Sequence, residues 1–458
     1  MNKKILLINP PIYDFAAYDL YNKPMGLLYV ASYIRQYGYE IELLDTLDRN
    51  NELLLQHHPK LKTKKNGTGK FHNIIVPKPE ILKHIPRNYR RYGMEEYLIR
   101  QQLEKHKHQR IGAVLITSMM TYWYLGVAEM VRIVREVLPG VPIALGGVYA
   151  TLMPDHAMGV CAPDIVFTGS QLTPVLRWLD EVCEFDRTEN VPETKLSQWP
   201  LPAYDLYSKL DYLSLITSLG CPNHCDYCAS KKLQPCYDEL PAKIFIEQLD
   251  ALLPLLGQQE IYNVAFIDDA LLANSARRIV PIMQMIAEKK QNLNFHCPNG
   301  LHCRYITEEI AQLMYNVGFK MIRLSYEAAG DSTGQKASDN KITDAHFHNA
   351  VSNLINAGFQ PDQIDVYVLI GLVDQGFDEM KRSVEAVHAV GLKARLCQFT
   401  PIPGSKMFDS ACEAFDLPRD EPLLHNNSIL SIRKNNIPQQ QWDQFKDYTQ
   451  QLNNKLDN

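Results

Sequence analysis

Short strand-like runs alternate with helical patterns along most of this 458-residue chain, and this alternation constrains the fold more than any other feature. Five strand-and-helix units precede residue 184, beginning with the apolar run KILLIN at Lys4–Asn9. Parallel strands need crossover helices, so the series predicts an α/β fold with a Rossmann-like, flavodoxin-type sheet over residues 1–184. Ligands of such sheets bind beyond the carboxyl ends of the strands. The loops at those ends are Asn9–Pro11, Ser118–Thr121, Gly146–Tyr149 and Thr168–Gln171.

A second alternating series covers residues 212–410 and holds six βα units of about 30 residues. It predicts a partial, TIM-like (βα)6 barrel with its reactive groups at the C-terminal rim. Residues 185–211 contain WPLPAYDLY and no clean period, which indicates a linker. Residues 411–458 form a polar extension rich in Asn and Gln. Its helical pattern predicts a docking helix with one face formed by Trp442, Phe445, Thr449 and Leu452.

Composition places the chain among ordinary globular proteins, with 46% apolar and 22% charged residues. No run of 18 apolar residues occurs, and the N-terminus lacks the features of a secretory signal, so we expect a cytoplasmic protein that spans no membrane. The ten cysteines should then stay reduced, and some of them are candidates for metal ligands or reactive thiols.

The net charge of −5 hides a basic insertion at residues 47–110. Residues 57–110 hold 14 Lys and Arg against 4 Asp and Glu. This island either binds an anion, such as the substrate, through Arg90 and Arg91, or is a solvated surface without a ligand. Nucleic acid is not an expected partner. We expect four histidines of the insertion to be solvated rather than to bind metal, namely His57, His58, His106 and His108.

Three cysteines form a C-x3-C-x2-C triplet directly after the first strand of the second series: Cys221, Cys225 and Cys228. Three thiolates on one short loop can each hold one iron of a cubane cluster, which leaves the fourth iron open to an exchangeable ligand. Zinc is the alternative, but a zinc site normally has a second pair of ligands and a different spacing.

This triplet, with Tyr227 at the aromatic position, resembles the CxxxCxΦC signature of the radical S-adenosylmethionine superfamily. Further segments fit the superfamily in order: FIDDAL, Asn299-Gly300, RLSYEA, IGLVDQG (where Val373 replaces the usual Pro) and TPIPGS. The resemblance implies that a 4Fe-4S cluster and S-adenosylmethionine bind at the barrel rim. The residues it implies for S-adenosylmethionine are Tyr227, Asp268, Asp269, Asn299, Glu327, Gly371 and Pro403.

The first 184 residues resemble the cobalamin-binding domain of one subclass, the class B methyltransferase-like enzymes. The resemblance rests on LLINPP, ALGGVYATLMPD and PDIVFTGS, and it implies a cobalamin site at Pro10, Ser118, Gly146, Gly147 and Gly169. Two positions depart from the usual pattern, because Ser170 replaces Glu and Tyr149 replaces His. No DxHxxG motif is present, so the bound cobalamin should be base-off.

The resemblance implies an enzyme that generates a 5′-deoxyadenosyl radical and methylates an unactivated carbon. A rearrangement, cyclisation or oxidation on the same architecture is the alternative, and a non-catalytic cobalamin or cluster sensor is a third. A one-electron donor such as flavodoxin or ferredoxin and a small-molecule or anionic substrate are the implied partners. A methylthiotransferase is disfavoured because no cysteine precedes Cys161.

Four further cysteines follow the triplet within the barrel: Cys236, Cys297, Cys303 and Cys397. We expect them to be packing residues, with an auxiliary cluster or a hydrogen donor to a substrate radical as the alternatives.

Overall fold

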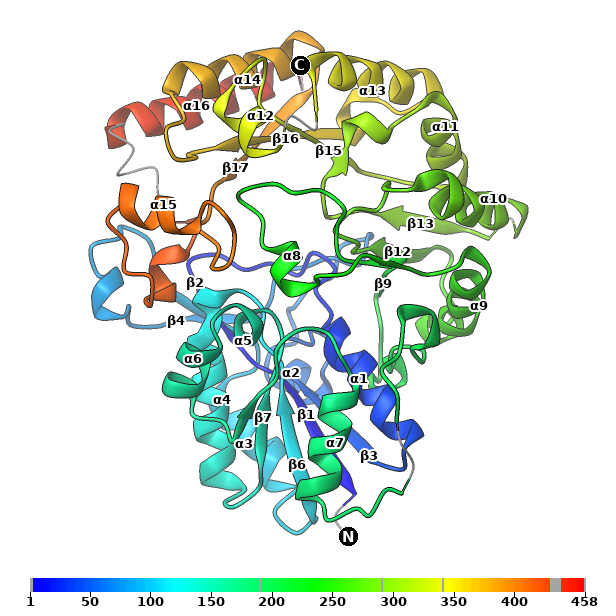
Figure 1. The fold of residues 1–458 in the computed structure, drawn as a ribbon, viewed down its shortest axis with the longest axis vertical. Coiled ribbons are helices and arrows are strands. Elements are labelled where there is room, and N and C mark those ends of the chain that lie inside the picture. Colours follow the sequence, from blue (N-terminus) through cyan, green and yellow to red (C-terminus); the bar gives the residue numbers. More distant parts are fainter. Residues whose placement is uncertain (1–2, 189–190, 290, 340–341, 429–437, 457–458) are drawn as a thin grey trace. The chain divides into compact units, whose positions relative to one another are not determined.

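The computed structural model describes residues 3–188, 191–289, 291–339, 342–428 and 438–456 (Figure 1). The chain forms two compact units, with unit 1 comprising Met1–Leu213 and Asp250–Gln258 and unit 2 the remainder. Parts of the predicted linker (189–190) and of the predicted C-terminal extension (429–437) lie outside the described residues.

Unit 1 is built on a five-stranded sheet in the order β3-β1-β6-β7-β8, with all neighbouring strands parallel. Counted by the strands of this sheet alone, the order is 2-1-3-4-5, which is the flavodoxin order and confirms the sequence prediction. The strands are β1 (Lys4–Asn9), β3 (Glu40–Asp45), β6 (Ile111–Ile116), β7 (Ile143–Leu145) and β8 (Ile165–Val166).

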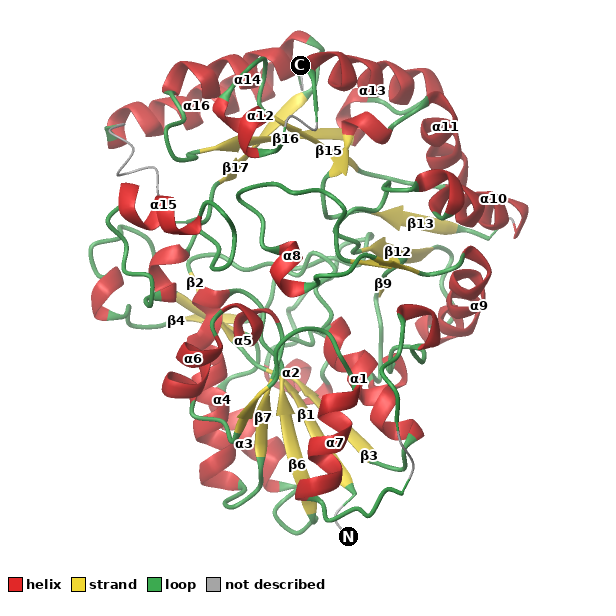
Figure 2. Cartoon of the chain, in the orientation of Figure 1, coloured by secondary structure: helices red, strands yellow, loops and turns green. Residues whose placement is uncertain are grey.

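Helices cover this sheet (Figure 2), and most of the apolar side chains of its strands are buried. They include α1 (Met25–Gln36), α4 (Tyr124–Val137), α5 (Val148–Leu152), α6 (Pro154–His156) and α7 (Thr173–Val182). Ile34 of α1 and Leu176 of α7 pack with Leu7 of β1 in one apolar cluster. The predicted linker joins the same cluster through Val191 and Ala203, so it packs on unit 1 instead of forming a free spacer.

The basic insertion is ordered and has its own secondary structure. It contains α2 (Glu52–His57), β4 (Asn73–Ile75), β5 (Arg90–Tyr92) and α3 (Glu96–Glu104). Strand β5 pairs antiparallel with β4 and with β2 (Ile12–Asp14), which follows β1, so the three form a second small sheet. Arg49 holds the turn before β4, because its guanidinium donates to the Asp19 carboxylate at 2.9 Å and to the Gly67 carbonyl at 2.6 Å.

Unit 2 is a partial barrel of parallel strands, as predicted. Its two sheets run in the orders β13-β12-β9 and β14-β15-β16-β17, and a parallel bridge between Phe295 and Phe319 joins them. The strands are β9 (Leu213–Leu215), β12 (Tyr262–Phe266), β13 (Leu293–His296), β14 (Leu301–His302), β15 (Ile322–Glu327), β16 (Ile364–Ile370) and β17 (Lys393–Gln398).

Helices lie outside the barrel strands: α9 (Ala242–Leu252), α10 (Ile279–Lys289), α11 (Glu308–Val317), α12 (Thr333–Ala337), α13 (Asp344–Ala357), α14 (Phe377–Ala389) and α15 (Phe408–Ala414). Helix α11 shows how the sequence sets their ends. The Thr307 hydroxyl caps its first turn, and Gly318 ends it with φ of 95°. None of the helices in the described ranges is long and apolar enough to cross a membrane.

The predicted docking helix is present as α16 (Gln439–Lys455). Trp442 and Phe445 are buried, and the ring of Phe445 packs edge-on against Phe377 of α14. The Asn453 side chain makes two hydrogen bonds with the backbone of Ala394, so α16 also satisfies polar groups on the outermost barrel strand. The helix therefore completes unit 2 at that edge.

Candidate active site

The cysteine triplet lies on one loop between β10 (Ser218–Leu219) and α8 (Ser230–Leu233). Cys221 and Cys225 are half-buried and Cys228 is exposed, and all three are free thiols. The loop is closed at its base, because β10 pairs antiparallel with β11 (Asp238–Glu239). Gly220 begins the loop with φ of 77°, and a Cβ there would lie 3.2 Å from the Cys236 carbonyl oxygen, so the turn needs glycine.

Polar donors surround the sulfur atoms of the triplet. The Ser230 N–H donates to Cys228 Sγ at 3.4 Å, and the Ser230 Oγ lies 3.2 Å from the same sulfur. The pKa of Cys221 is raised overall, because burial outweighs the opposing effect of a hydrogen bond from the Asn223 backbone. Such N–H donors stabilise the thiolate form, which is the form that binds metal.

Three thiolates on one short loop fit a cubane cluster, because each thiolate there binds a different iron. In the described part of the chain, the only group of three or more His, Cys, Asp or Glu residues with ligand atoms within 4.8 Å of one another lies elsewhere, in the basic insertion.

Tyr227 lies between Cys225 and Cys228 in the sequence, and its side chain interacts with Glu327 at the end of β15. Its ring packs on the apolar cluster that contains Leu369 and Phe399. Burial, followed by Glu327 and Cys225, raises the pKa of Tyr227. Glu327 ends β15 beside a register shift and has φ of 71°, an uncommon conformation for a residue other than glycine. The structure thus brings together the aromatic residue of the signature and the carboxylate predicted to bind S-adenosylmethionine.

The Asp268 carboxylate is buried and hydrogen-bonded within the protein. It accepts hydrogen bonds from the Thr217 N–H and hydroxyl, the Ser218 hydroxyl and Arg278 Nη1, at 2.7–3.2 Å. These donors occupy the carboxylate, so it serves as an internal anchor for the chain leading to Cys221. The contact of this segment with S-adenosylmethionine stays a prediction.

Asp269 points toward the cysteine loop instead. Its carboxylate makes a hydrogen bond with Ser230, and burial raises its pKa. Ser230 also donates to Cys228. This serine therefore connects Asp269, on the loop after β12, to the cysteine triplet.

The remaining predicted residues also lie in loops at the carboxyl ends of strands. The Asn299 side chain donates to the Asp268 carbonyl at 2.9 Å, so it joins the second and third strand loops. Gly371 follows β16 with φ of 78°. Pro403 belongs to the loop after β17, which contacts the cysteine loop where the Met407 N–H donates to the Asp226 carbonyl at 2.9 Å. The rim loops are thus tied to one another.

Polar side chains line the inner face of the barrel strands, and motif reasoning did not single out most of them. In β15 the side chains alternate, so that Tyr326 stacks on Phe347 of α13 while Arg323 lies on the opposite, inner face. Arg323 Nη1 donates to the Cys297 carbonyl at 3.2 Å, and its charge lowers the pKa of Tyr367, which burial raises overall to about 12. Along β15, apolar or aromatic residues alternate with polar ones in the sequence IRLSYE, and this alternation is the sequence signal that could have located the inner barrel face.

Cys297 and Cys397 lie near this inner face, and Cys303 is buried. Burial raises the pKa of both Cys297 and Cys397 to about 12. The Cys297 thiol donates to the Asn299 carbonyl and the Cys303 thiol to the Ser325 carbonyl, each at 3.2 Å. Protonated thiols that donate to carbonyls agree with the expectation of packing residues.

In unit 1 the residues predicted for cobalamin follow four neighbouring strands at one edge of the sheet. The Ser118 hydroxyl donates to the Gly146 carbonyl at 2.7 Å, and Gly147 has φ of 96°. A Cβ on Gly147 would lie 2.3 Å from the Ser118 carbonyl oxygen, so only glycine fits there. Gly169 has open space around it. Pro10 follows β1, which lies next to β6 at the switch point of the sheet.

Tyr149 replaces the histidine that the resemblance leads one to expect, and it points inward. Its side chain is fully buried (0% exposed), and its hydroxyl lies 2.6 Å from His156 Nδ1. Burial raises the pKa of Tyr149. His156 is held by this hydrogen bond, so neither residue extends from the loop as a metal ligand. The base-off state of a bound cobalamin stays a prediction.

The two arginines predicted to bind an anionic substrate differ in their environment. Arg91 is 3% exposed, pairs with Glu129 of α4 at 3.0 Å and donates to the Met94 carbonyl at 2.6 Å. It therefore holds the insertion to the sheet domain and is not available to a ligand, which corrects the expectation for this residue. Arg90 is half-buried and lines a cavity of about 540 Å³ together with Lys70.

Comparison with known proteins relates these features to characterised folds. No family model matches the chain. It is 22% identical over 385 residues to the cytidylyl-2-hydroxyethylphosphonate methyltransferase of Streptomyces wedmorensis, which covers 71% of this chain and 65% of the relative. It is 24% identical over 246 residues to an uncharacterised methyltransferase of Synechocystis, covering 51% and 44%. The chain thus spans less than two thirds of either relative.

Two solved structures share the fold. The radical S-adenosylmethionine methyltransferase TsrM of Kitasatospora setae, with cobalamin and a [4Fe-4S] cluster bound, matches with a TM-score of 0.64 at 14% identity, covering 90% of this chain and 78% of that one. The cobalamin-dependent S-adenosylmethionine radical enzyme OxsB with aqua-cobalamin matches with a TM-score of 0.57 at 13% identity, covering 89% and 55%. The chain shares the fold of these two structures, with a flavodoxin-order sheet and a partial parallel barrel, and the sequence predicted both of these parts.

Proposed function

We propose that this protein is a cobalamin-dependent radical S-adenosylmethionine methyltransferase that methylates an unactivated carbon. The observation that carries the proposal is the cysteine triplet, which lies on the loop after the first strand of a parallel half-barrel. A flavodoxin-order sheet precedes this barrel in the chain, and the two solved structures that share the fold are a radical S-adenosylmethionine methyltransferase and a cobalamin-dependent S-adenosylmethionine radical enzyme. The methyltransferase names of both sequence relatives support the same reaction class.

The residues present fit a 4Fe-4S cluster and S-adenosylmethionine. Cys221, Cys225 and Cys228 supply three thiolates, which leaves one iron for the amino and carboxylate groups of S-adenosylmethionine. When bound, this pair supplies a 5′-deoxyadenosyl radical. Tyr227 shields the cluster loop on its buried side, and Glu327 offers a carboxylate at the same rim. Exclusion of water by such packing protects a reactive radical.

The rim of unit 1 fits cobalamin, which supplies the methyl group in this proposal. Gly146, Gly147 and Gly169 keep side-chain atoms away from that edge, so a large planar ligand can approach the backbone. Ser118 fixes the loops after β6 and β7 relative to each other. Because Tyr149 is turned inward, the protein supplies no imidazole to cobalt from that position. The base-off state remains what the family resemblance implies.

The substrate in this proposal is a polar small molecule. The inner barrel face carries Arg323 and Tyr367, whose donor groups suit an anionic or hydroxylated compound. The reaction also needs a low-potential electron, which we assign to a one-electron donor such as flavodoxin or ferredoxin. We propose a cytoplasmic location, which a need for reduced thiols and for such donors supports.

Anaerobic reconstitution of the full chain with iron, sulfide and cobalamin tests the proposal. Under reducing conditions we expect both 5′-deoxyadenosine and S-adenosylhomocysteine by mass spectrometry. Deoxyadenosine without S-adenosylhomocysteine would establish a rearrangement instead, and the absence of both products from a reduced, loaded enzyme would refute both.

A matched pair of variants tests the cluster ligands. The Cys225→Ala variant should lose the visible absorbance of the cluster and both products. The Cys236→Ala variant removes an exposed thiol outside the triplet and should retain them. Retention of the cluster absorbance by Cys225→Ala would show that the ligand assignment is wrong.

A further inference from the structure

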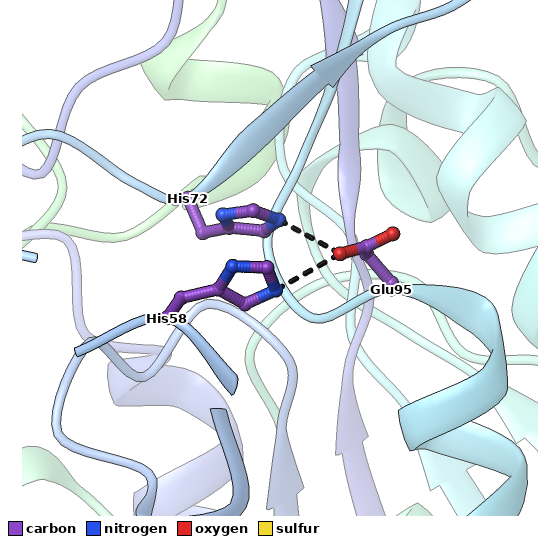
Figure 3. Close-up of side chains that lie close together, drawn as sticks. All are labelled: His58, His72 and Glu95. Atoms are coloured by element: carbon purple, nitrogen blue, oxygen red, sulfur yellow. Dashed lines mark hydrogen bonds and ion pairs between the residues drawn. The ribbon is translucent and has the colours of Figure 1, made fainter. Parts of the chain in front are cut away.

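Three side chains of the basic insertion converge on one point (Figure 3). His58 lies at the end of α2, His72 comes directly before β4, and Glu95 comes directly before α3. His58 Nε2 lies 2.9 Å and His72 Nε2 lies 3.2 Å from the same oxygen, Oε1 of Glu95. The two imidazole rings are stacked, with centroids 3.7 Å apart and planes 23° apart.

The distances approach those of ligands around one metal ion. Zinc binds imidazole nitrogen and carboxylate oxygen at about 2.0–2.1 Å, so two ligand atoms of a tetrahedral site lie about 3.3 Å apart. The two observed nitrogen–oxygen distances are 2.9 and 3.2 Å, and all three ligand atoms lie within 4.8 Å of one another. Small side-chain rotations would therefore admit an ion.

The surroundings of the cluster leave room for an ion to enter. The side chains of His58, His72 and Glu95 are 13–28% exposed, so the three ligand atoms are partly shielded from water but are reached from the surface.

We propose that His58, His72 and Glu95 bind one divalent transition metal ion, with Zn²⁺ as the ion that this ligand set favours. Two histidines and one glutamate leave a fourth coordination position for water or an anionic group, as in catalytic zinc sites. The sequence expectation that His58 is solvated is replaced by this assignment. The site does not depend on the proposed methyltransferase activity.

The ion would connect three segments that are far apart in the sequence. His58 is 37 residues and His72 is 23 residues from Glu95. Joining them would fix the end of α2, the start of β4 and the start of α3 in one arrangement, and so would make the insertion more rigid. Binding in the folded state alone should therefore stabilise unit 1.

Metal analysis of the reconstituted, cluster-loaded protein provides the first test. After equilibration with Zn²⁺ and gel filtration, we expect one zinc per chain in the wild type and in a His106→Ala control. His106 also faces a carboxylate, Glu42 at 3.2 Å, but belongs to no cluster of three ligands among the described residues. His72→Ala should lower the zinc affinity at least about tenfold. Equal zinc content in His72→Ala and wild type would overturn the proposal.

Zinc bound to the cluster cysteines must be distinguished from zinc at this site. Co²⁺ titration of the full chain with Cys221, Cys225 and Cys228 all changed to Ser provides that distinction. We expect visible d–d bands of a nitrogen- and oxygen-ligated ion, without thiolate charge-transfer absorbance. The absence of these bands would overturn the proposal.

A conservative variant guards against a simple loss of folding. Glu95→Gln keeps the shape of the side chain but removes its charge. Wild-type protein should gain about 5 °C or more in unfolding midpoint on addition of Zn²⁺. Glu95→Gln should fold, as judged by circular dichroism, and lose most of this gain. A full gain in Glu95→Gln would refute the ligand role of Glu95.

Discussion

Replacing Arg278 by Met should loosen the chain segment that leads to the cysteine triplet. Arg278 is 1% exposed, and its guanidinium lies 3.2 Å from the Asp268 carboxylate. Its Nη2 also donates to three backbone carbonyls at 2.9–3.1 Å, those of Ala270, Leu271 and Ala273. The variant would therefore leave a buried carboxylate without its counterion and three carbonyls without this donor.

The expected cost follows from the burial of this pair. Removing one partner of a buried ion pair typically costs about 3–5 kcal/mol, because the remaining charge stays desolvated. The Asp268 carboxylate keeps its hydrogen bonds from Thr217 and Ser218, which places the expected loss near the lower end, at about 3 kcal/mol. By RT ln K, that corresponds to a roughly 100-fold larger equilibrium constant for opening of the segment, and to correspondingly faster hydrogen exchange.

Hydrogen exchange measured by mass spectrometry is the assay, read on peptides that cover residues 213–220 and 262–270. The neighbouring Arg277 provides a matched control, since it is 70% exposed on its side chain and pairs with Glu239 at 2.7 Å. Arg277→Met should change the exchange of the same peptides by less than about tenfold. If Arg278→Met exchanged no faster than Arg277→Met, the anchoring role assigned to the Asp268–Arg278 pair would be refuted.

Three further predictions concern other parts of the molecule. Gly147→Ala would place a Cβ 2.3 Å from the Ser118 carbonyl oxygen at positive φ, so it should lower the thermal unfolding midpoint clearly more than Gly140→Ala, where φ is 81° but the space is open. Burial lowers the pKa of His296 from 6.5 to about 4. Between pH 6.5 and pH 4 the unfolded chain therefore binds a proton at His296 that the folded chain does not, so the free energy of unfolding falls as the pH is lowered through this range. His296→Gln should remove up to about 3 kcal/mol of this loss in urea titrations at pH 4 and 7. Trp442→Ala should destabilise unit 2 by about 3–5 kcal/mol in urea unfolding, because the indole is 2% exposed, and a loss below about 1 kcal/mol would contradict its docking role.

Local patterns were sufficient where function depends on residues close together in the sequence. Cys221, Cys225 and Cys228 lie on one loop, so their spacing alone predicts a shared metal centre. The strand and helix periods likewise predicted the parallel sheet of unit 1 and the partial barrel of unit 2. The structure confirms the flavodoxin order of the first and the parallel strands of the second.

Residues whose role depends on a distant partner could not be assigned in this way. Asp268 ends a strand at the rim, as a ligand would, but a guanidinium ten residues later turns its carboxylate into an anchor. Arg91 lies in a basic stretch, yet Glu129 of α4 neutralises it inside unit 1. Charge counts treat every arginine alike, whereas burial against a particular carboxylate decides which one can meet a ligand.

The sequence by itself therefore determined the layers of the fold and the chemistry of the cysteine loop, because both are written in short-range periodicity and spacing. Tertiary structure alone decided which charged groups are internal and which side chains converge. The cluster of His58, His72 and Glu95 is the clearest case, since its members come from three elements and only the folding of the insertion brings their nitrogen and oxygen atoms together.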